Sequence, residues 1–354
     1  MTDLKGLLVG RGASVRDVME CIDRNTRGIV LVVDDDRRLI ATITDGDIRR
    51  GILADVSPEA PLQQLLERKR EEDYPQPVTA PVGTTPDELL RTMNEQVLRH
   101  IPLVDADGRV ADVVLLTDLV RGYDLPLRAV VMAGGFGTRL APLTDDLPKP
   151  MLPVGGRPVL ERIVDQLRSS GIRRVHLTTH YRADTIVEHF GDGSDFGVQI
   201  EYMNEREPLG TAGALSLLEA SQDPILVMNG DIVTRVDITA MLDFHREHAA
   251  AMTVAAQPYE THIPFGVLNT DGAVVNAIEE KPVIRRLVNA GIYLLDSDVC
   301  RYVPRDEPSD ISQLIARLLA DRRRVVAFPL HEYWVDIGHP ERYDQALADH
   351  AAPR

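Results

Sequence analysis

Two kinds of hydrophobic pattern divide the chain. In residues 30–50 and 101–121, two short apolar runs flank an Asp-rich turn, and a polar step into a helix follows. From residue 129 to about residue 330, short apolar runs alternate with longer amphipathic stretches. That alternation is typical of a doubly wound, mostly parallel α/β sheet. We therefore expect an α/β protein with two domains, joined by a linker at residues 123–128.

The alternation predicts individual elements in both regions. Strands are expected over 129–133, 174–179, 198–203, 225–229, 252–257 and 325–328, and helices over 157–170, 182–190, 211–220, 237–249 and 309–320. In the first region, helices are expected over 13–25 and 84–96. Thr85 is followed three residues later by Glu88, which is the pattern of a capping box.

The first region is an internal repeat. Its two segments align without a gap, and this alignment pairs Asp34 with Asp105 and Asp47 with Asp118. Repetition of a whole strand–turn–strand–helix unit predicts two small modules that pack on one another.

These modules resemble a tandem pair of CBS (cystathionine-β-synthase-type) domains over residues 8–122, within a first domain of residues 1–122. The resemblance implies that Thr44 and Asp47 bind an adenosine nucleotide (AMP, ADP or ATP), with the hydroxyl near a phosphate and the carboxylate on the ribose. Leu115 replaces the threonine in the second module while Asp118 remains, so we expect one nucleotide, bound mainly by the first module. Alternatively, both aspartates only cap helices.

CBS pairs commonly associate face to face, so the resemblance also implies a homodimer or higher homo-oligomer built through residues 8–122. The alternative to regulation by a nucleotide is that the pair serves only for this dimerisation.

Composition removes several classes of function. The net charge is −16 and no basic tract occurs, which argues against nucleic acid and anionic membrane surfaces as partners. Cys21 and Cys300 have no metal-site spacing. No apolar run reaches the roughly 18 residues of a membrane span, and the N-terminus lacks a signal-peptide pattern. We therefore expect a cytoplasmic protein.

The first apolar run of the second region leads into a glycine-rich loop at residues 132–140. Gly134, Gly135 and Gly137 allow backbone amides to approach a phosphate. The spacing fits neither a P-loop nor a dinucleotide fingerprint. Together with P-K-P-M-L-P-V at residues 148–154, the loop resembles the signature of nucleotide-diphosphate-sugar pyrophosphorylases.

This second resemblance covers residues 127–346 and predicts a catalytic domain over residues 127–354. It implies that Arg139 and Lys149 hold the triphosphate, chiefly the leaving pyrophosphate. The residues expected to bind the nucleotide are Met132, Ala133, Gly134, Gly135, Gly137, Thr138, Gly210, Thr211, Asn229 and Gly230.

Two acidic positions are the expected metal ligands. An apolar run ends in Asn-Gly-Asp231, which places a carboxylate at the carboxyl edge of the sheet, where α/β sheets bind ligands. The resemblance implies that Asp231 and Asp336 together hold Mg²⁺. Either aspartate alone is equally well explained as a helix cap or turn residue.

The sugar end of the site is expected in the segment 278–293. The resemblance implies that Glu280 contacts sugar hydroxyls, that Lys281 contacts the sugar phosphate as a catalytic cation, and that Asn289 and Gly291 lie against the sugar. Taken alone, Glu280 and Lys281 read as a solvated charged turn before a proline.

The implied reaction joins a sugar 1-phosphate to a nucleoside triphosphate and releases pyrophosphate. The form P-L-G-T-A-G-A-L at residues 208–215 resembles guanylyltransferases, so we expect GTP with an aminosugar, mannose-like or heptose phosphate. Alternatives are uridylyl or cytidylyl transfer and, from a different class, an inactive nucleotide-sensing protein. The chain carries no hexapeptide repeat, so the bifunctional acetyltransferase type is not expected.

Overall fold

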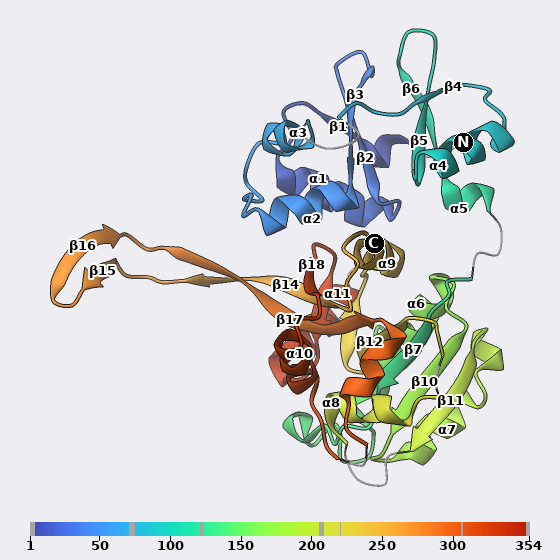
Figure 1. The fold of residues 1–354 in the computed structure, drawn as a ribbon, viewed down its shortest axis with the longest axis vertical. Helices are drawn as coiled ribbons and strands as arrows, with labels where there is room; N and C mark the ends of the chain where they lie inside the picture. Colours follow the sequence, from blue (N-terminus) through green and yellow to red (C-terminus); the bar gives the residue numbers. More distant parts are fainter. Residues whose placement is uncertain are drawn as a thin grey trace.

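The repeated region and the larger α/β domain form two bodies that contact each other (Figure 1). The computed structural model describes residues 4–70, 75–120, 124–204, 209–219, 221–305 and 307–351. The N-terminal body, coloured blue to teal, lies above the α/β domain in this view. No helix in these described ranges is long and apolar enough to cross a membrane.

The two repeats fold into matching three-stranded sheets, β1-β2-β3 and β4-β5-β6. Strands β2 (Ile29–Val33) and β3 (Leu39–Thr44) recur in the second repeat as β5 (His100–Val104) and β6 (Val110–Leu115). Arg38 and Arg109, which occupy equivalent positions in the two repeats, form an antiparallel bridge that joins the two turns. The predicted repeat is therefore confirmed, and its equivalent positions touch.

Short helices complete each module. The first contains β1 (Leu8–Gly10), α1 (Val15–Asn25), α2 (Asp45–Leu53) and α3 (Gln63–Lys69), and the second contains β4 (Ala80–Pro81), α4 (Pro86–Glu95) and α5 (Leu116–Leu119). The predicted capping box is confirmed, because Glu88 N–H donates to Thr85 Oγ1 at 3.4 Å and Thr85 N–H donates to Glu88 Oε2 at 3.1 Å.

The larger domain is built on a seven-stranded sheet of order β11-β10-β7-β12-β17-β14-β18. Its strands are β7 (Arg128–Met132), β10 (Arg174–Thr179), β11 (Gln199–Asn204), β12 (Ile225–Asn229), β14 (Met252–His262), β17 (Val283–Leu295) and β18 (Val325–Pro329). Within this sheet, β17 runs antiparallel to both of its neighbours, and the other pairings are parallel. The mostly parallel α/β sheet is therefore confirmed.

Helices cover both faces of this sheet, because its strands are apolar on both sides. They are α6 (Val159–Ser169), α7 (Ala183–Phe190), α9 (Ile238–Glu247), α10 (Ile311–Ala320) and α11 (Pro340–Ala351). The expected helix 211–220 is largely wrong: one α-turn, α8 (Gly210–Gly213), leads into a 3₁₀ turn over Ala214–Leu217. The amides of Ala212 and Gly213 donate to Ser309 O instead of continuing a helix.

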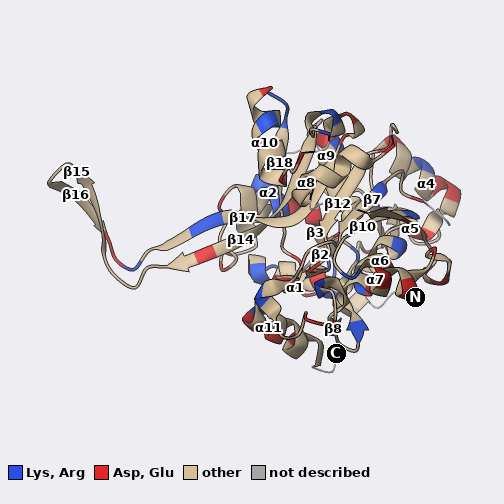
Figure 2. Cartoon of the chain, turned by 90° about the horizontal axis from the view of Figure 1, so that it is seen from below, with Lys and Arg blue, Asp and Glu red and all other residues tan. Residues whose placement is uncertain are grey.

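A long two-stranded ribbon has no counterpart among the sequence-based predictions. The outer halves of β14 and β17 continue beyond the sheet as this ribbon, which ends in β15 (Val267–Asp271) and β16 (Val274–Glu279). We call residues 259–287 the arm. The arm stands clear of both bodies in two perpendicular views (Figures 1 and 2).

A buried ion-pair cluster joins the first module to the α/β domain. Arg49 of α2 is 1% exposed and donates to Asp45 at 2.6 Å and to Glu332 Oε1 at 2.6 Å. Its guanidinium lies 3.6 Å from the centre of the Phe328 ring. His331 Nε2 lies 2.6 Å from Asp45 Oδ1. One face of α2 is therefore packed on the α/β domain of the same chain.

Candidate functional site

The glycine-rich loop follows β7 and wraps against the Lys149 segment. Gly137 has a φ of 66°, and a Cβ there would lie 2.9 Å from Thr144 Cγ2 and 3.0 Å from Lys149 Cβ. A larger residue would therefore push the loop and the lysine apart. Thr144 Oγ1 donates to Gly137 O at 2.9 Å, which holds the two segments together.

Strand pairing brings the two predicted metal ligands together. Asp231 follows β12, and the short strand β13 (Ile232–Thr234) pairs with β19 (Trp334–Asp336) in a register that sets Ile232 opposite Asp336. Ile337 N–H donates to Asp231 O at 3.0 Å. Carboxylates that are far apart in sequence therefore meet at the carboxyl edge of the sheet.

Lys149 lies between these carboxylates. Its Nζ is ion-paired with Asp231 and lies 3.9 Å from Asp336 Oδ1. Asp231 Oδ1 is buried and has no hydrogen-bond partner among the described residues. Burial, together with the charge of Asp231, raises the pKa of Asp336. Two convergent carboxylates with an unused oxygen are a donor set that fits a hard divalent cation such as Mg²⁺.

A pocket of about 270 Å³ opens beside this cluster. Eight of the residues predicted to bind substrate or metal line it: Met132, Gly134, Gly135, Lys149, Gly210, Thr211, Asn229 and Asp231. Of the other predicted residues, Ala133 is buried beneath the loop, while Thr138 and Arg139 are exposed on a 3₁₀ turn beyond it.

The inner end of β17 reaches the same place. Gly291 has a φ of 71°, and a Cβ there would lie 2.6 Å from Asn229 Nδ2. Asn289 Oδ1 accepts from Gly291 N–H at 3.0 Å, and Trp334 Nε1 donates to Ala290 O at 2.9 Å. The predicted positions Asn289 and Gly291 therefore lie next to Asn229 and β19.

The structure does not bring Glu280 and Lys281 to this cluster, which corrects the expected grouping. Both are exposed on the arm, where Lys281 N–H donates to Phe265 O at 3.3 Å. Because β17 is one continuous strand, at about 3.3 Å per residue Lys281 lies on the order of 30 Å from Gly291. The motif predicted the residues but not the direction of the ribbon that carries them.

Four further pocket residues were not among the predicted site residues: Phe136, Pro150, Thr178 and Asp310. Asp310 Oδ1 accepts from Thr211 N–H at 3.3 Å and from Thr211 Oγ1 at 3.4 Å, and Thr178 lies one residue before the end of β10. Asp310 lies at the start of the predicted helix 309–320, where it reads as an ordinary cap. No local signal links it to Thr211.

The predicted regulatory residues differ between the two modules. The Asp47 carboxylate is 3% exposed and accepts from Lys69 Nζ at 2.6 Å, from Arg50 at 2.6 Å and from Thr44 N–H at 2.7 Å. Asp118 is half exposed, accepts from Leu115 N–H at 3.1 Å and lies 3.8 Å from Arg27. Both aspartates therefore make the helix-capping contacts that were the alternative explanation, and Asp47 has no carboxylate oxygen left free of a partner.

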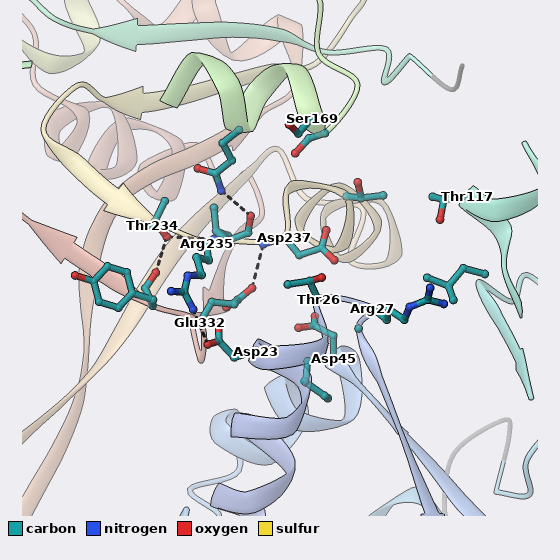
Figure 3. A pocket seen from close by; sticks show the side chains of 18 of the residues that line it. Asp23, Thr26, Arg27, Asp45, Thr117, Ser169, Thr234, Arg235, Asp237 and Glu332 are labelled. Atoms are coloured by element: carbon teal, nitrogen blue, oxygen red, sulfur yellow. Dashed lines mark hydrogen bonds and ion pairs between the residues drawn. The ribbon is translucent and has the colours of Figure 1, made fainter. Parts of the chain in front are cut away.

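A larger cavity, of about 970 Å³, lies where both modules meet the α/β domain. Figure 3 shows Thr26 and Arg27 from the first module, Thr117 from the second, and Ser169, Arg235 and Asp237 from the α/β domain around it. The buried Nη1 of Arg27 has no hydrogen-bond partner among the described residues. No residue of the glycine-rich loop lines this cavity, so it is separate from the smaller pocket.

Comparison with protein families matches both regions. The nucleotidyl transferase family matches residues 128–352, and the CBS domain family matches residues 7–54 and 70–124.

Individual relatives cover the second region. The chain is 35% identical over 230 residues to a mannose-1-phosphate guanylyltransferase of Mycobacterium tuberculosis, a match that spans 62% of this chain and 64% of that protein. It is 33% identical over 227 residues to a mannose-1-phosphate guanyltransferase of Kluyveromyces lactis, covering 61% and 63% of the two chains. The match thus spans less than two thirds of these relatives' own length.

Two crystal structures share the fold. One, of a Bacillus anthracis protein assigned as a glucose-1-phosphate thymidylyltransferase, superposes with a TM-score of 0.53 at 27% identity and covers 64% of this chain and 96% of that one. The other, HddC from Yersinia pseudotuberculosis, has a TM-score of 0.50 at 28% identity and covers 63% and 98%.

Proposed function

This chain belongs to the nucleotidyl transferase family and carries a pair of CBS domains, and we propose that it transfers a nucleotidyl group from a nucleoside triphosphate to a sugar 1-phosphate. The observation that carries the proposal is the pocket in which the glycine-rich loop, Lys149 and the carboxylate of Asp231 converge. Loop amides and an ammonium suit phosphate oxygens, and paired carboxylates suit the cation that accompanies them.

The reaction is an in-line displacement. An oxygen of the sugar phosphate forms a bond to the α-phosphorus of the triphosphate, and the bond from that phosphorus to the bridging oxygen breaks, so that pyrophosphate leaves with the electron pair. A phosphate dianion is already a nucleophile, so the protein supplies alignment and charge neutralisation. In this proposal the amides of Gly134 and Gly135 hold the triphosphate, and Lys149 and Arg139 stabilise the leaving pyrophosphate.

Asp231 and Asp336 would hold Mg²⁺. When bound, this ion supplies neutralisation and orientation of the phosphate oxygens. Asn229 and Gly291, which lie against each other, border the sugar side.

We propose GTP as the nucleotide and a mannose-like or aminosugar phosphate as its partner. The form of residues 208–215 and the guanylyltransferase names of the relatives support this choice. The test is pyrophosphate release by the purified full chain with Mg²⁺, each of GTP, UTP, CTP, dTTP and ATP, and a panel of sugar 1-phosphates. The highest kcat/KM is expected with GTP. A higher value with UTP or CTP would overturn the choice of base, and no turnover with any pair would overturn the activity.

A second proposed function is regulation by an adenosine nucleotide bound at the CBS pair, in the cavity of about 970 Å³. The cavity supports a ligand there, and so does the buried Nη1 of Arg27, which lies 3.8 Å from Asp118 and has no hydrogen-bond partner among the described residues. Since Asp47 is already occupied by Lys69 and Arg50, we expect Arg27 to matter more for binding than Asp47.

Calorimetry with AMP, ADP and ATP tests this regulatory proposal. Arg27→Ala is expected to weaken binding at least tenfold and Asp47→Asn to weaken it less. The exposed Arg16→Ala is the matched control. Absence of binding of all three nucleotides to the unmodified chain would leave only a structural role for the pair.

A further inference from the structure

Exposed apolar side chains are concentrated on the arm. Nine of the eighteen exposed large hydrophobic side chains in the described part of the chain lie within it. They include Phe265, which is 72% exposed, and Ile278, which is 67% exposed. Isolated two-stranded ribbons are only marginally stable in water. So many apolar side chains on one ribbon therefore indicate a surface that another protein covers.

The arm also carries two charged side chains, those of Lys281 and Glu280. Lys281 has a φ of 49°, a left-handed conformation that non-glycine residues seldom adopt and that is enriched at functional sites. Glu280 lies beside Gly266, where a Cβ would come 2.9 Å from Glu280 Oε2. The arm thus presents a cation and a carboxylate beside an apolar surface.

The described pocket of this chain has no second cation among its lining residues. Lys149 is the only cation among the residues that line the described pocket, and it is paired with Asp231. Attack of one phosphate on another brings two anions together, and a cation on the sugar side would add to the neutralisation assigned to Mg²⁺ and Arg139. In this chain Lys281 is on the order of 30 Å away along β17.

The arm is not built to fold back over its own site. β14 and β17 pair without interruption from Ala256↔Asn289 to His262↔Val283, and Glu260 accepts from Arg285 Nε at 2.8 Å within the ribbon. The register shift in this pairing lies inside the sheet, between Val254 and Ala256. Folding the arm back onto its own domain would need a sharp bend in this ladder, whereas insertion into a neighbour needs none.

We propose that the arm completes the active site of a second copy of this chain, delivering Lys281 and Glu280 in trans. The apolar side chains of the arm pack around the mouth of the partner's pocket, where Phe136 is 49% exposed. The exchange is reciprocal, because a two-fold axis that places one arm in a neighbour's site places the neighbour's arm in the first. The catalytic role of Lys281 and Glu280 in the partner's site rests on the proposed function. The pairing of two copies rests on the apolar surface of the arm alone.

Complementation between two inactive variants tests the proposal. Asp231→Asn disables the pocket and keeps the arm, whereas Lys281→Ala keeps the pocket and disables the arm. The two variants are co-expressed with different tags, and the mixed dimers are purified through both tags. Each mixed dimer has one intact site out of two. We therefore expect about half of the wild-type pyrophosphate release, against less than about a twentieth for either variant alone. Asp231→Asn co-expressed with Asp336→Asn is the control and must stay inactive.

The outcomes distinguish a failure of delivery in trans from a failure of the proposed nucleotidyl transfer. Mixed dimers that stay as inactive as their parents would overturn delivery in trans, and so would full activity of Lys281→Ala alone. Sedimentation of a Phe265→Ser, Ile278→Ser double variant tests the pairing without any activity. We expect its assembly to have half the wild-type mass, and an unchanged mass would overturn the pairing even if the enzyme proves inactive on every substrate.

Discussion

At the scale of single residues, the environment of Asp231 and Asp336 explains how two carboxylates can lie close together. Each faces the Lys149 ammonium, and burial together with Asp231 raises the pKa of Asp336. A divalent cation would relieve the repulsion between the two acids more fully than a single ammonium does.

Asp231→Asn and Asp336→Asn should each lower kcat by at least about tenfold, a loss of more than ~1.4 kcal/mol of transition-state stabilisation. The reason is that each removes a charged ligand for the metal. Pyrophosphate release across a Mg²⁺ titration measures the effect. Asp298→Asn, at a surface carboxylate that pairs with Arg323, is the control. Retention of more than a tenth of the wild-type kcat by either site variant would contradict the metal assignment.

The buried His100 should make the folded chain less stable in acid. Burial lowers its pKa to about 4 from the usual 6.5, while its Nε2 lies 2.9 Å from Arg27 O. Between these values the unfolded chain binds a proton that the folded chain does not, so stability falls as the pH falls from 6.5 towards 4. Because the ring partly faces the cavity, we expect a loss of about 1–3 kcal/mol.

Urea unfolding from pH 4 to pH 7.5 measures this loss. His100→Gln should flatten the acid side of the stability curve, and His262→Gln, at a site 73% exposed, should not. An unchanged acid slope in His100→Gln would assign the loss to other groups.

At the scale of elements, α2 and the segment after β18 form a buried contact that joins the two domains. Glu332 accepts from Arg49 and also from Asp237 N–H at 3.1 Å, and it stands four residues before Asp336. Burial alone would raise the pKa of Asp45, but the Arg49 guanidinium and His331 outweigh it and hold that pKa well below its usual range. The carboxylates of Asp45 and Glu332 are therefore ionised and closely paired with Arg49.

Arg49→Met should lower the free energy of unfolding by about 3–5 kcal/mol, because it leaves two buried carboxylates without their cation. Arg16→Met is the matched control, since its side chain is 54% exposed where it pairs with Glu59 and the change should cost less than about 1 kcal/mol. Thermal or urea unfolding measures both variants. Equal losses in the two would show that the cluster contributes no more than a surface pair.

At the scale of the whole molecule, the cavity and the ion-pair cluster adjoin each other where the modules meet the catalytic domain. Asp45 and Glu332 line the cavity, as Figure 3 shows, and both pair with Arg49. A ligand in the cavity is therefore in a position to bias the segment that carries Asp336. Such a bias is allostery only if the ligand binds two states of the catalytic domain unequally.

An adenosine nucleotide that binds the CBS pair should change the affinity for GTP by roughly 5- to 150-fold. Glu332→Gln should keep nucleotide binding and reduce this change, because it weakens the Arg49 link. GTP binding measured by calorimetry with and without the nucleotide, in both proteins, is the test. A change of equal size in Glu332→Gln would place the coupling elsewhere, and no change in the unmodified chain would leave the pair without a regulatory role.

The sequence by itself determined the features that depend on local pattern. The repeat in the first region, six of the seven strands of the large sheet (all but β17), the glycine-rich loop and the carboxylate at the end of β12 follow from hydrophobic periodicity and short motifs. Each element of this set needs only residues close together in the chain.

Only the tertiary structure decided the contacts between residues far apart in sequence. The pairing of β13 with β19 selects Asp336 as the partner of Asp231, and Lys69 occupies the carboxylate that the motif assigned to a ribose. Arg49 meets Glu332 across 283 residues, and the continuous strand β17 carries Lys281 away from the pocket. Local periodicity says which face of an element is apolar, but the pairing of strands and the packing of domains decide what that face meets.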